Sequence, residues 1–67
     1  MINITVNGDT QRHAQPLALS ELLLSMALAG KKVAVEKNGE IVPRSVHGST
    51  LVRDGDRLEI VIAVGGG

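Results

Sequence analysis

One stretch of the chain has the periodicity of a helix, and the other patterned stretches have that of strands. Leu19, Leu22, Leu23 and Met26 lie at the i, i+3, i+4, i+7 spacing of a helix that packs one side on a core, which predicts a single helix over residues 17–29. Because one helix covers only one face of a sheet, the other face is left open. The sequence therefore predicts an α+β fold, with a mixed four- to five-stranded sheet and one main helix across one face.

Two Asn-Gly pairs divide the strand-like stretches into hairpins. Asn7-Gly8 follows the alternating apolar residues of the first strand, and Asn38-Gly39 follows a second apolar stretch; both residues of such a pair accept a positive φ. The last stretch is the longest and the most apolar, so we place it in the middle of the sheet, between the first strand and the strand that begins at Val33. The predicted strands are residues 2–6, about 11–15, 33–37, 40–42 and 58–64.

The last apolar run, residues 58–64, lacks Gly and Pro and is rich in β-branched side chains, a pattern typical of a strand buried on both faces. With only one helix, however, nothing covers half of its side chains. The side chains expected to face the helix are Leu58, Ile60 and Ile62. Val61, Ala63 and Val64 form a candidate partner-binding surface, because an open sheet face is usually polar. The alternative is that Val61 is a scattered apolar surface residue without a role.

The chain ends in three glycines, Gly65, Gly66 and Gly67. They predict a flexible C-terminal tail (65–67) attached to a domain formed by residues 1–64. A tail without Cβ atoms can thread a narrow channel and bring the α-carboxylate of Gly67 into the active site of another protein. A carboxylate is a poor electrophile, so transfer through it requires activation as a mixed anhydride, typically with ATP. The alternative is that the glycines are a frayed chain end.

Composition argues against several other classes of function. The 67 residues include no Cys, Phe, Tyr or Trp, which excludes disulfides and thiolate sites and disfavours the stacking platforms that bind single-stranded nucleic acids. Seven basic and seven acidic residues cancel, so no strong field attracts nucleic acid or anionic lipid. His13 and His47 lie far apart in the sequence, and we expect both to be solvated rather than ligands of a metal. We expect no metal and no bound cofactor.

The same sequence gives no sign of a membrane or export segment. No stretch reaches the apolar length that spans a membrane, and residues 1–4 lack the basic region and long apolar block of a signal peptide. We therefore expect a cytoplasmic protein with neither a membrane nor a nucleic-acid partner.

Several pieces of the chain, in order and at matching length, resemble the ThiS family of sulfur carrier proteins. The matching pieces are residues 1–7, LSELL at 19–23, NGEIVPR at 38–44, DGD at 54–56 and VIAVGGG at 61–67. The more specific of these signals are the Ile-Val-Pro-Arg segment and the terminal glycines. The chain departs from the family pattern at Ala18, where a polar helix cap is expected, and in having no aromatic residue near the tail.

The resemblance implies a β-grasp (ubiquitin-like) fold and a protein that is not itself an enzyme. In this family an E1-like adenylyltransferase of the ThiF type uses MgATP to adenylate the terminal glycine, here Gly67. The acyl adenylate is then converted to a thiocarboxylate with sulfur from a donor protein. The carrier delivers this sulfur to thiazole synthase of the ThiG type, for thiazole formation in thiamin biosynthesis. Gly66 is then the second residue of the required glycine pair, and Gly65 extends the tail.

Three alternatives remain open at this point. A sibling carrier would supply sulfur for molybdopterin or cysteine synthesis through the same terminal chemistry. A ubiquitin-like modifier would be joined to lysines of other proteins. A β-grasp binding module with an inert tail would keep its function after deletion of Gly66 and Gly67.

Overall fold

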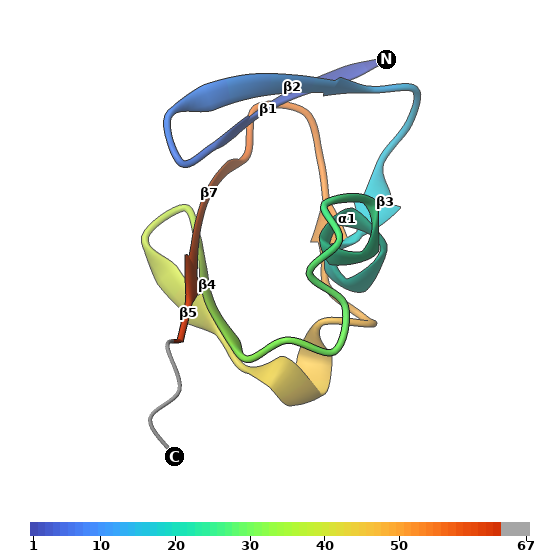
Figure 1. Cartoon of the computed structure of the whole chain (residues 1–67). Coiled ribbons are helices and arrows are strands. Elements are labelled where there is room, and N and C mark those ends of the chain that lie inside the picture. Colours follow the sequence, from blue (N-terminus) through green and yellow to red (C-terminus); the bar gives the residue numbers. More distant parts are fainter. Residues whose placement is uncertain (64–67) are drawn as a thin grey trace.

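The computed structural model describes residues 1–63 of the chain, and in this part a mixed five-stranded sheet carries the helix α1 (Leu19–Ser25) across one face (Figure 1). The strands of this sheet are β1 (Ile2–Val6), β2 (Asp9–His13), β4 (Val33–Lys37), β5 (Glu40–Val42) and β7 (Arg57–Ile62). A second, two-stranded sheet pairs β3 (Leu17–Ala18) with β6 (Leu51–Val52), and a 3-10 turn, η1 (Arg44–Val46), precedes β6. The predicted α+β class, with one helix on one face of a mixed sheet, is confirmed for the described residues.

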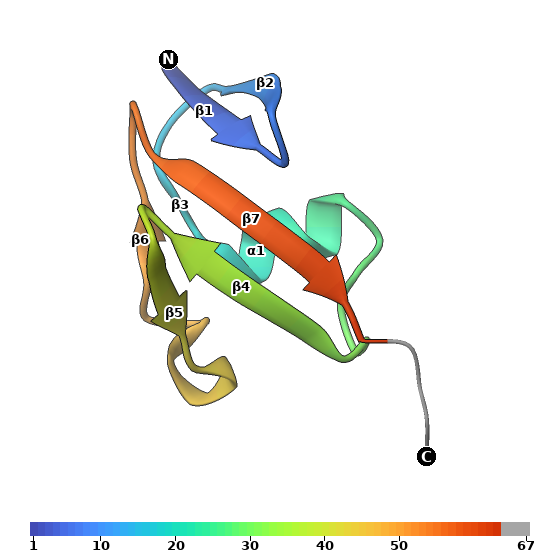
Figure 2. The same ribbon diagram turned by 90° about the vertical axis from the view of Figure 1, so that its left-hand side faces the viewer.

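The order of the strands is β2-β1-β7-β4-β5, so the last strand lies in the centre as predicted (Figure 2). β7 pairs in parallel with β1, where Val6 lies opposite Leu58, and antiparallel with β4, where Val35 lies opposite Ile60. Asn7 extends the contact with β7 beyond the end of β1. Its side-chain Oδ1 accepts from the N–H of Ile60 (2.7 Å) and its Nδ2 donates to the carbonyl of the same residue (3.0 Å).

A single core lies between the sheet and α1. Leu19, Leu22 and Leu23 of the predicted helical stripe are buried, and Met26 packs on the edge of the core. The sheet and β6 supply the remaining buried apolar side chains, which are Ile2, Ile4, Val6, Val35, Val52, Leu58 and Ile60. The period-two pattern therefore identified the buried face correctly in β1 and over most of β7.

The helix is shorter than the predicted range of 17–29, and its start is displaced by β3. Leu17 pairs with Val52 instead of entering the helix, and the N–H of Leu19 donates to the carbonyl of Thr50 (2.8 Å). Ala18 occupies the N-cap position without a side-chain hydrogen bond, in agreement with the missing polar cap noted in the sequence. The carbonyl of Thr50, the residue just before β6, replaces the usual side-chain cap.

The helix also ends earlier than the predicted residue 29, because Met26 is the C-cap and Ala27 is the residue after it. Ala27 has φ +61°, its N–H donates to Leu24 (3.0 Å), and the N–H of Leu28 donates to Leu23 (2.8 Å). This pair of bonds is a Schellman motif, which normally has Gly at the left-handed position. Alanine there carries a steric cost of about 1 kcal/mol, which explains why the sequence pattern did not reveal the end.

Two strand predictions also need correction. β2 spans Asp9–His13 instead of residues 11–15, because the two-residue turn at Asn7 (φ +50°) and Gly8 (φ +86°) places Asp9 directly opposite Val6. The last strand is buried on one face only. Ile62, predicted to face the helix, is about half exposed because β1 ends opposite Leu58 and leaves the end of β7 flanked by β4 alone.

Candidate functional site

The open face of the sheet carries a cluster of exposed apolar side chains. Val61 is 63% exposed and lies directly opposite Ala34, which is also exposed. Ala63 follows two residues later on the same side, and Ile41, 77% exposed, lies diagonally across from Ala34. We call these four residues the open-face patch. The predicted exposure of Val61 and Ala63 is confirmed, and their role in binding a partner stays a prediction.

Sequence reasoning missed the contribution of β4 and β5 to this patch. The Asn38-Gly39 turn sets the register in which Glu36 lies opposite Ile41, so alternation along this hairpin would have placed Ala34 and Ile41 on the face that carries Val61. The patch therefore spans three neighbouring strands, and it is wider than the strip on the last strand that the sequence predicted.

Two carboxylates border the open-face patch. Glu36 and Glu59 are exposed and lie directly opposite each other on β4 and β7. Together with Gly39 and Arg57 they line a surface pocket of about 230 Å³. Like charges at directly opposed positions destabilise a sheet. The open face thus combines apolar groups with a repelling acidic pair, a surface that contributes little to the stability of the isolated domain.

One end of the open-face patch, formed by Val61 and Ala63, comes shortly before the terminal residues in the sequence. The N–H of Ala63 donates to the carbonyl of Lys32 (2.9 Å), which holds the chain at the end of β7. The predicted surface residue Val64 and the predicted tail residues Gly65, Gly66 and Gly67 lie outside the described residues. Any protein bound over Val61 and Ala63 therefore lies within a few residues of the Gly67 carboxylate along the chain.

The two histidines are not solvated as predicted. His47 is 7% exposed, and its Nε2 donates to the carbonyl of Val42 (3.1 Å). His13 is half-buried, with its Nε2 3.1 Å from Oε1 of Gln11. The prediction failed because η1 folds His47 back under the end of β5, a contact between segments that periodicity does not report.

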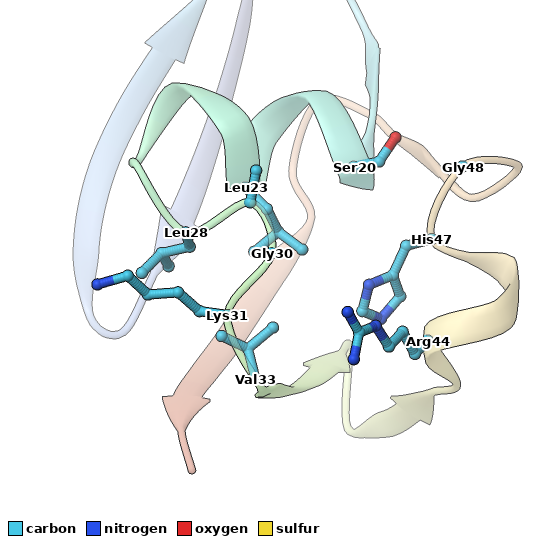
Figure 3. Close-up of a pocket in the computed structure, with 10 residues that line it drawn as sticks. Ser20, Leu23, Leu28, Gly30, Lys31, Val33, Arg44, His47 and Gly48 are labelled. Carbon is cyan, nitrogen blue, oxygen red and sulfur yellow. The ribbon is translucent and has the colours of Figure 1, made fainter. Parts of the chain in front are cut away.

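The described residues carry little else that resembles a site of chemistry. Within residues 1–63, no group of three or more His, Cys, Asp or Glu side chains is placed to hold a metal ion. None of the helices in this part of the chain has the length and apolarity needed to cross a membrane. A second pocket, on the helix side of the sheet, is lined in part by Lys31, Arg44 and His47 (Figure 3).

Comparison with known proteins gives one family. The model of the ThiS family matches residues 2–67, a range that includes the terminal glycines. The crystal structure of the thiamine biosynthesis protein ThiS from Geobacter metallireducens superposes with a TM-score of 0.84 at 39% identity, covering 98% of this chain and 100% of that one. This likeness confirms the β-grasp fold that the sequence resemblance implied.

Relatives with other names share the same region. A thiazole synthase from Paramagnetospirillum magneticum is 39% identical over 66 residues, which cover 98% of this chain and 20% of that protein. An uncharacterized protein, ycf40, from Porphyra purpurea is 35% identical over 98% of this chain and 93% of its own length. The chain thus spans about a fifth of the thiazole synthase that it matches. The fold, the family model and the close structural likeness agree: the chain belongs to the ThiS family.

Proposed function

We propose that this chain is a sulfur carrier whose C-terminal Gly67 bears the sulfur as a thiocarboxylate, for thiazole formation in thiamin biosynthesis. The observation that carries the proposal is the match to the ThiS family over residues 2–67, because ThiS proteins are small sulfur carriers and the match includes the terminal glycines. The likeness to ThiS of G. metallireducens and to a protein named thiazole synthase supports the thiamin branch over the sibling carriers.

The chemistry begins with activation of the terminal carboxylate. An E1-like enzyme of the ThiF type binds MgATP, an oxygen of the Gly67 carboxylate attacks the α-phosphorus, and pyrophosphate leaves. Sulfur supplied at the sulfide level by a donor protein then attacks the acyl carbon, and AMP leaves. The resulting thiocarboxylate is the nucleophile that a thiazole synthase of the ThiG type consumes. The carrier itself supplies the reacting group, and its partners supply the catalytic residues and the MgATP.

The open-face patch is the surface that we assign to the activating enzyme. Its residues are apolar and exposed, and two of them, Val61 and Ala63, lie within a few residues of the terminus in the sequence, next to Val64 of the sequence prediction. Covering exposed aliphatic groups stabilises a complex without altering the isolated fold. A partner seated here is positioned to take up Gly67.

Pyrophosphate exchange tests the activation step. With the ThiF-type enzyme and MgATP, the chain should support exchange of labelled pyrophosphate into ATP, and deletion of Gly66 and Gly67 should abolish that exchange. The deletion should leave the melting temperature almost unchanged, because it removes no residue of the buried core or of the two sheets described in residues 1–63. Exchange that persists after the deletion would show that activation does not require Gly66 and Gly67, and a full chain that supports no exchange with an active enzyme would favour a binding module.

Binding tests the docking surface. Val61→Asp places a charge within an apolar contact and should weaken association with the ThiF-type enzyme about tenfold or more. Leu24→Asp is the matched control, because Leu24 is exposed to a similar degree (66%) but lies on α1, on the other side of the molecule. Equal affinities for the two variants would remove the open-face patch from the interface.

A further inference from the structure

The helix side of the molecule contains a pocket that the proposed terminal chemistry does not use. Its volume is about 260 Å³, and it lies between the loop that follows α1 and the turn η1 (Figure 3). The apolar part of the lining comes from Leu23, Leu28 and Val33. Leu23 belongs to α1, Leu28 to the loop that follows it and Val33 to the sheet face that α1 covers, so the pocket and the open-face patch lie on opposite sides of the sheet.

The polar part of this pocket is cationic. Lys31 and Arg44 both line it, and none of the lining residues is acidic. Within residues 1–63 the one ion pair joins Lys37 to Asp56 (3.8 Å), so neither Lys31 nor Arg44 is paired with a carboxylate of this part of the chain. Since the whole chain has no net charge, this local positive charge is no consequence of a basic protein, and Figure 3 shows the Lys31 amine and the Arg44 guanidinium at opposite rims of the pocket.

Further hydrogen-bond donors belong to the same wall. Gly48 lies next to Ser20, whose Oγ would be 4.0 Å from a Cβ at Gly48. Among the hydrogen bonds found in residues 1–63, none uses the N–H of Gly48 or the hydroxyl of Ser20. The buried ring of His47 is held by its bond to Val42 and keeps η1, which carries Arg44, against the rim. Ser20 and Gly48 are exposed, so these donors are open to solvent and accessible to a ligand that accepts hydrogen bonds, such as an anion beside Arg44.

The mixture of apolar and cationic side chains in the lining also indicates which kind of anion fits the pocket. An inorganic anion would use the cations and leave the leucine and valine side chains uncovered. Lys31 and Arg44 are exposed, so water and salt would screen their attraction for a free ion, whereas a protein segment lying over the rim excludes that water. A carboxylate next to an aliphatic group satisfies both parts of the pocket at once.

We propose that this pocket binds an acidic side chain, flanked by an aliphatic one, in a segment of a partner protein. Arg44 contacts the carboxylate, Lys31 adds positive charge at the opposite rim of the pocket, and Leu23, Leu28 and Val33 receive the aliphatic group. A partner bound here leaves the open-face patch uncovered, so the chain is able to hold two proteins at the same time. The site goes beyond the proposed function, because binding here requires no change at Gly67.

The test is a titration of the ¹⁵N-labelled full chain, followed by NMR, with two matched peptides. Acetyl-Leu-Glu-Leu-amide should bind in the millimolar range and shift the amide signals of the pocket, notably those of Lys31, Arg44 and Gly48. Acetyl-Leu-Gln-Leu-amide, which lacks only the charge, should bind at least severalfold more weakly. Equal binding of both peptides, or shifts confined to β4, β5 and β7, would overturn the proposal.

Variants of the chain assign the binding to the pocket. Arg44→Gln should weaken the Glu peptide roughly fivefold, the effect of losing one ion pair of about 1 kcal/mol. Arg53→Gln makes the same change at an exposed arginine outside the pocket and should leave the affinity unchanged. Equal losses in the two variants would show a general charge effect and contradict the site.

Two further titrations separate this occupant from the others. Inorganic phosphate should not compete with the Glu peptide at equal concentration; effective competition would make the pocket a site for free anions and overturn the proposal. A chain that ends at Ala63 should bind the Glu peptide with the affinity of the full chain. A clear gain in affinity on this truncation would show that the chain's own terminal carboxylate occupies the pocket. Pyrophosphate exchange does not enter these readouts, so this inference and the proposed function fail separately.

Discussion

The two faces of the central sheet carry similar aliphatic side chains and differ in what covers them. On the helix side, Ile4, Val35 and Leu58 are almost completely buried, whereas on the open side Val61 and Ile41 keep more than half of their surface exposed. β7 contributes to both faces, because successive side chains of a strand point to opposite sides. One strand thus holds the core together with one half of its residues and presents an uncovered surface with the other half.

This difference shows where stability and binding reside in such a small domain. A chain of 67 residues is large enough for one apolar core. In residues 1–63 that core lies on the side of the sheet that α1 covers. The open face has aliphatic groups that add nothing to folding and two opposed carboxylates that oppose it. Residues that do not stabilise the isolated domain thus lie where a partner is expected to dock.

The contrast between the two faces is tested most directly by truncating two side chains of β7, one from each face. Leu58→Ala removes a fully buried side chain and should lower the free energy of unfolding by about 3 kcal/mol, because it leaves a cavity under α1. Val61→Ala, the matched control on the open face, should change it by no more than about 0.5 kcal/mol. Urea unfolding of both variants measures the contrast, and losses of equal size would contradict the assignment of the two faces.

The junction that keeps β1 beside β7 should produce the next largest effect. Asn7→Ala removes two hydrogen bonds to the backbone of Ile60 and places alanine at a positive φ, so it should cost about 2 kcal/mol. Asn38→Ala is the matched control at the other Asn-Gly turn. The hydrogen bonds that the Asn38 side chain makes with Asp56 and Arg57 are both exposed. Water replaces exposed bonds, so Asn38→Ala should cost less; an order reversed in thermal unfolding would refute this account of Asn7.

The helix that covers the closed face can be made more stable at its end. Ala27→Gly relieves the left-handed strain at φ +61° and should raise the free energy of unfolding by about 1 kcal/mol. Ala29→Gly is the control, because it adds the same flexibility to the unfolded chain but lies outside the Schellman motif. It should give no gain in the free energy of unfolding. Denaturant unfolding that shows Ala27→Gly to be destabilising would contradict the observed helix end.

The smallest effect concerns the acidic pair of the open face. Glu36→Gln removes the repulsion with Glu59 and should stabilise the domain by a few tenths of a kcal/mol at low salt, with the gain fading as the salt concentration rises. Glu40→Gln changes the charge equally at an exposed position that faces Lys37 across the hairpin, and it should give no such gain. Melting temperatures at two salt concentrations decide the point, since a gain independent of salt would exclude repulsion as its cause.

Local signals accounted for most of the fold. The Asn-Gly turns at Asn7 and Asn38 and the leucine stripe of α1 each act over a few residues, and the exceptional apolarity of the last strand was enough to place it in the centre of the sheet. The end of the helix was not predictable in this way. Ala27 adopts a conformation that its side chain disfavours, so its identity points away from the observed structure.

The candidate sites depended more on contacts between distant segments. Val61 and Ala63 were found from alternation along one strand, but Ile41 joins them only through the register of the β4–β5 hairpin. His47 is buried because η1 folds back to Val42, and the helix-side pocket combines α1, the following loop and η1. Such combinations follow from the tertiary fold, which short sequence patterns do not encode.

The most direct test of the sulfur-carrier account is the mass of the terminal residue after activation. The chain is incubated with the ThiF-type enzyme, MgATP and a sulfur donor, treated with a thiol-alkylating reagent, and analysed intact and as peptides. Alkylation is needed because exchange of one oxygen for sulfur is nearly isobaric with oxidation of Met1 or Met26. We predict an ATP-dependent alkyl group that maps to Gly67. An unmodified terminus, with the enzyme shown to be active on another carrier, would contradict the account.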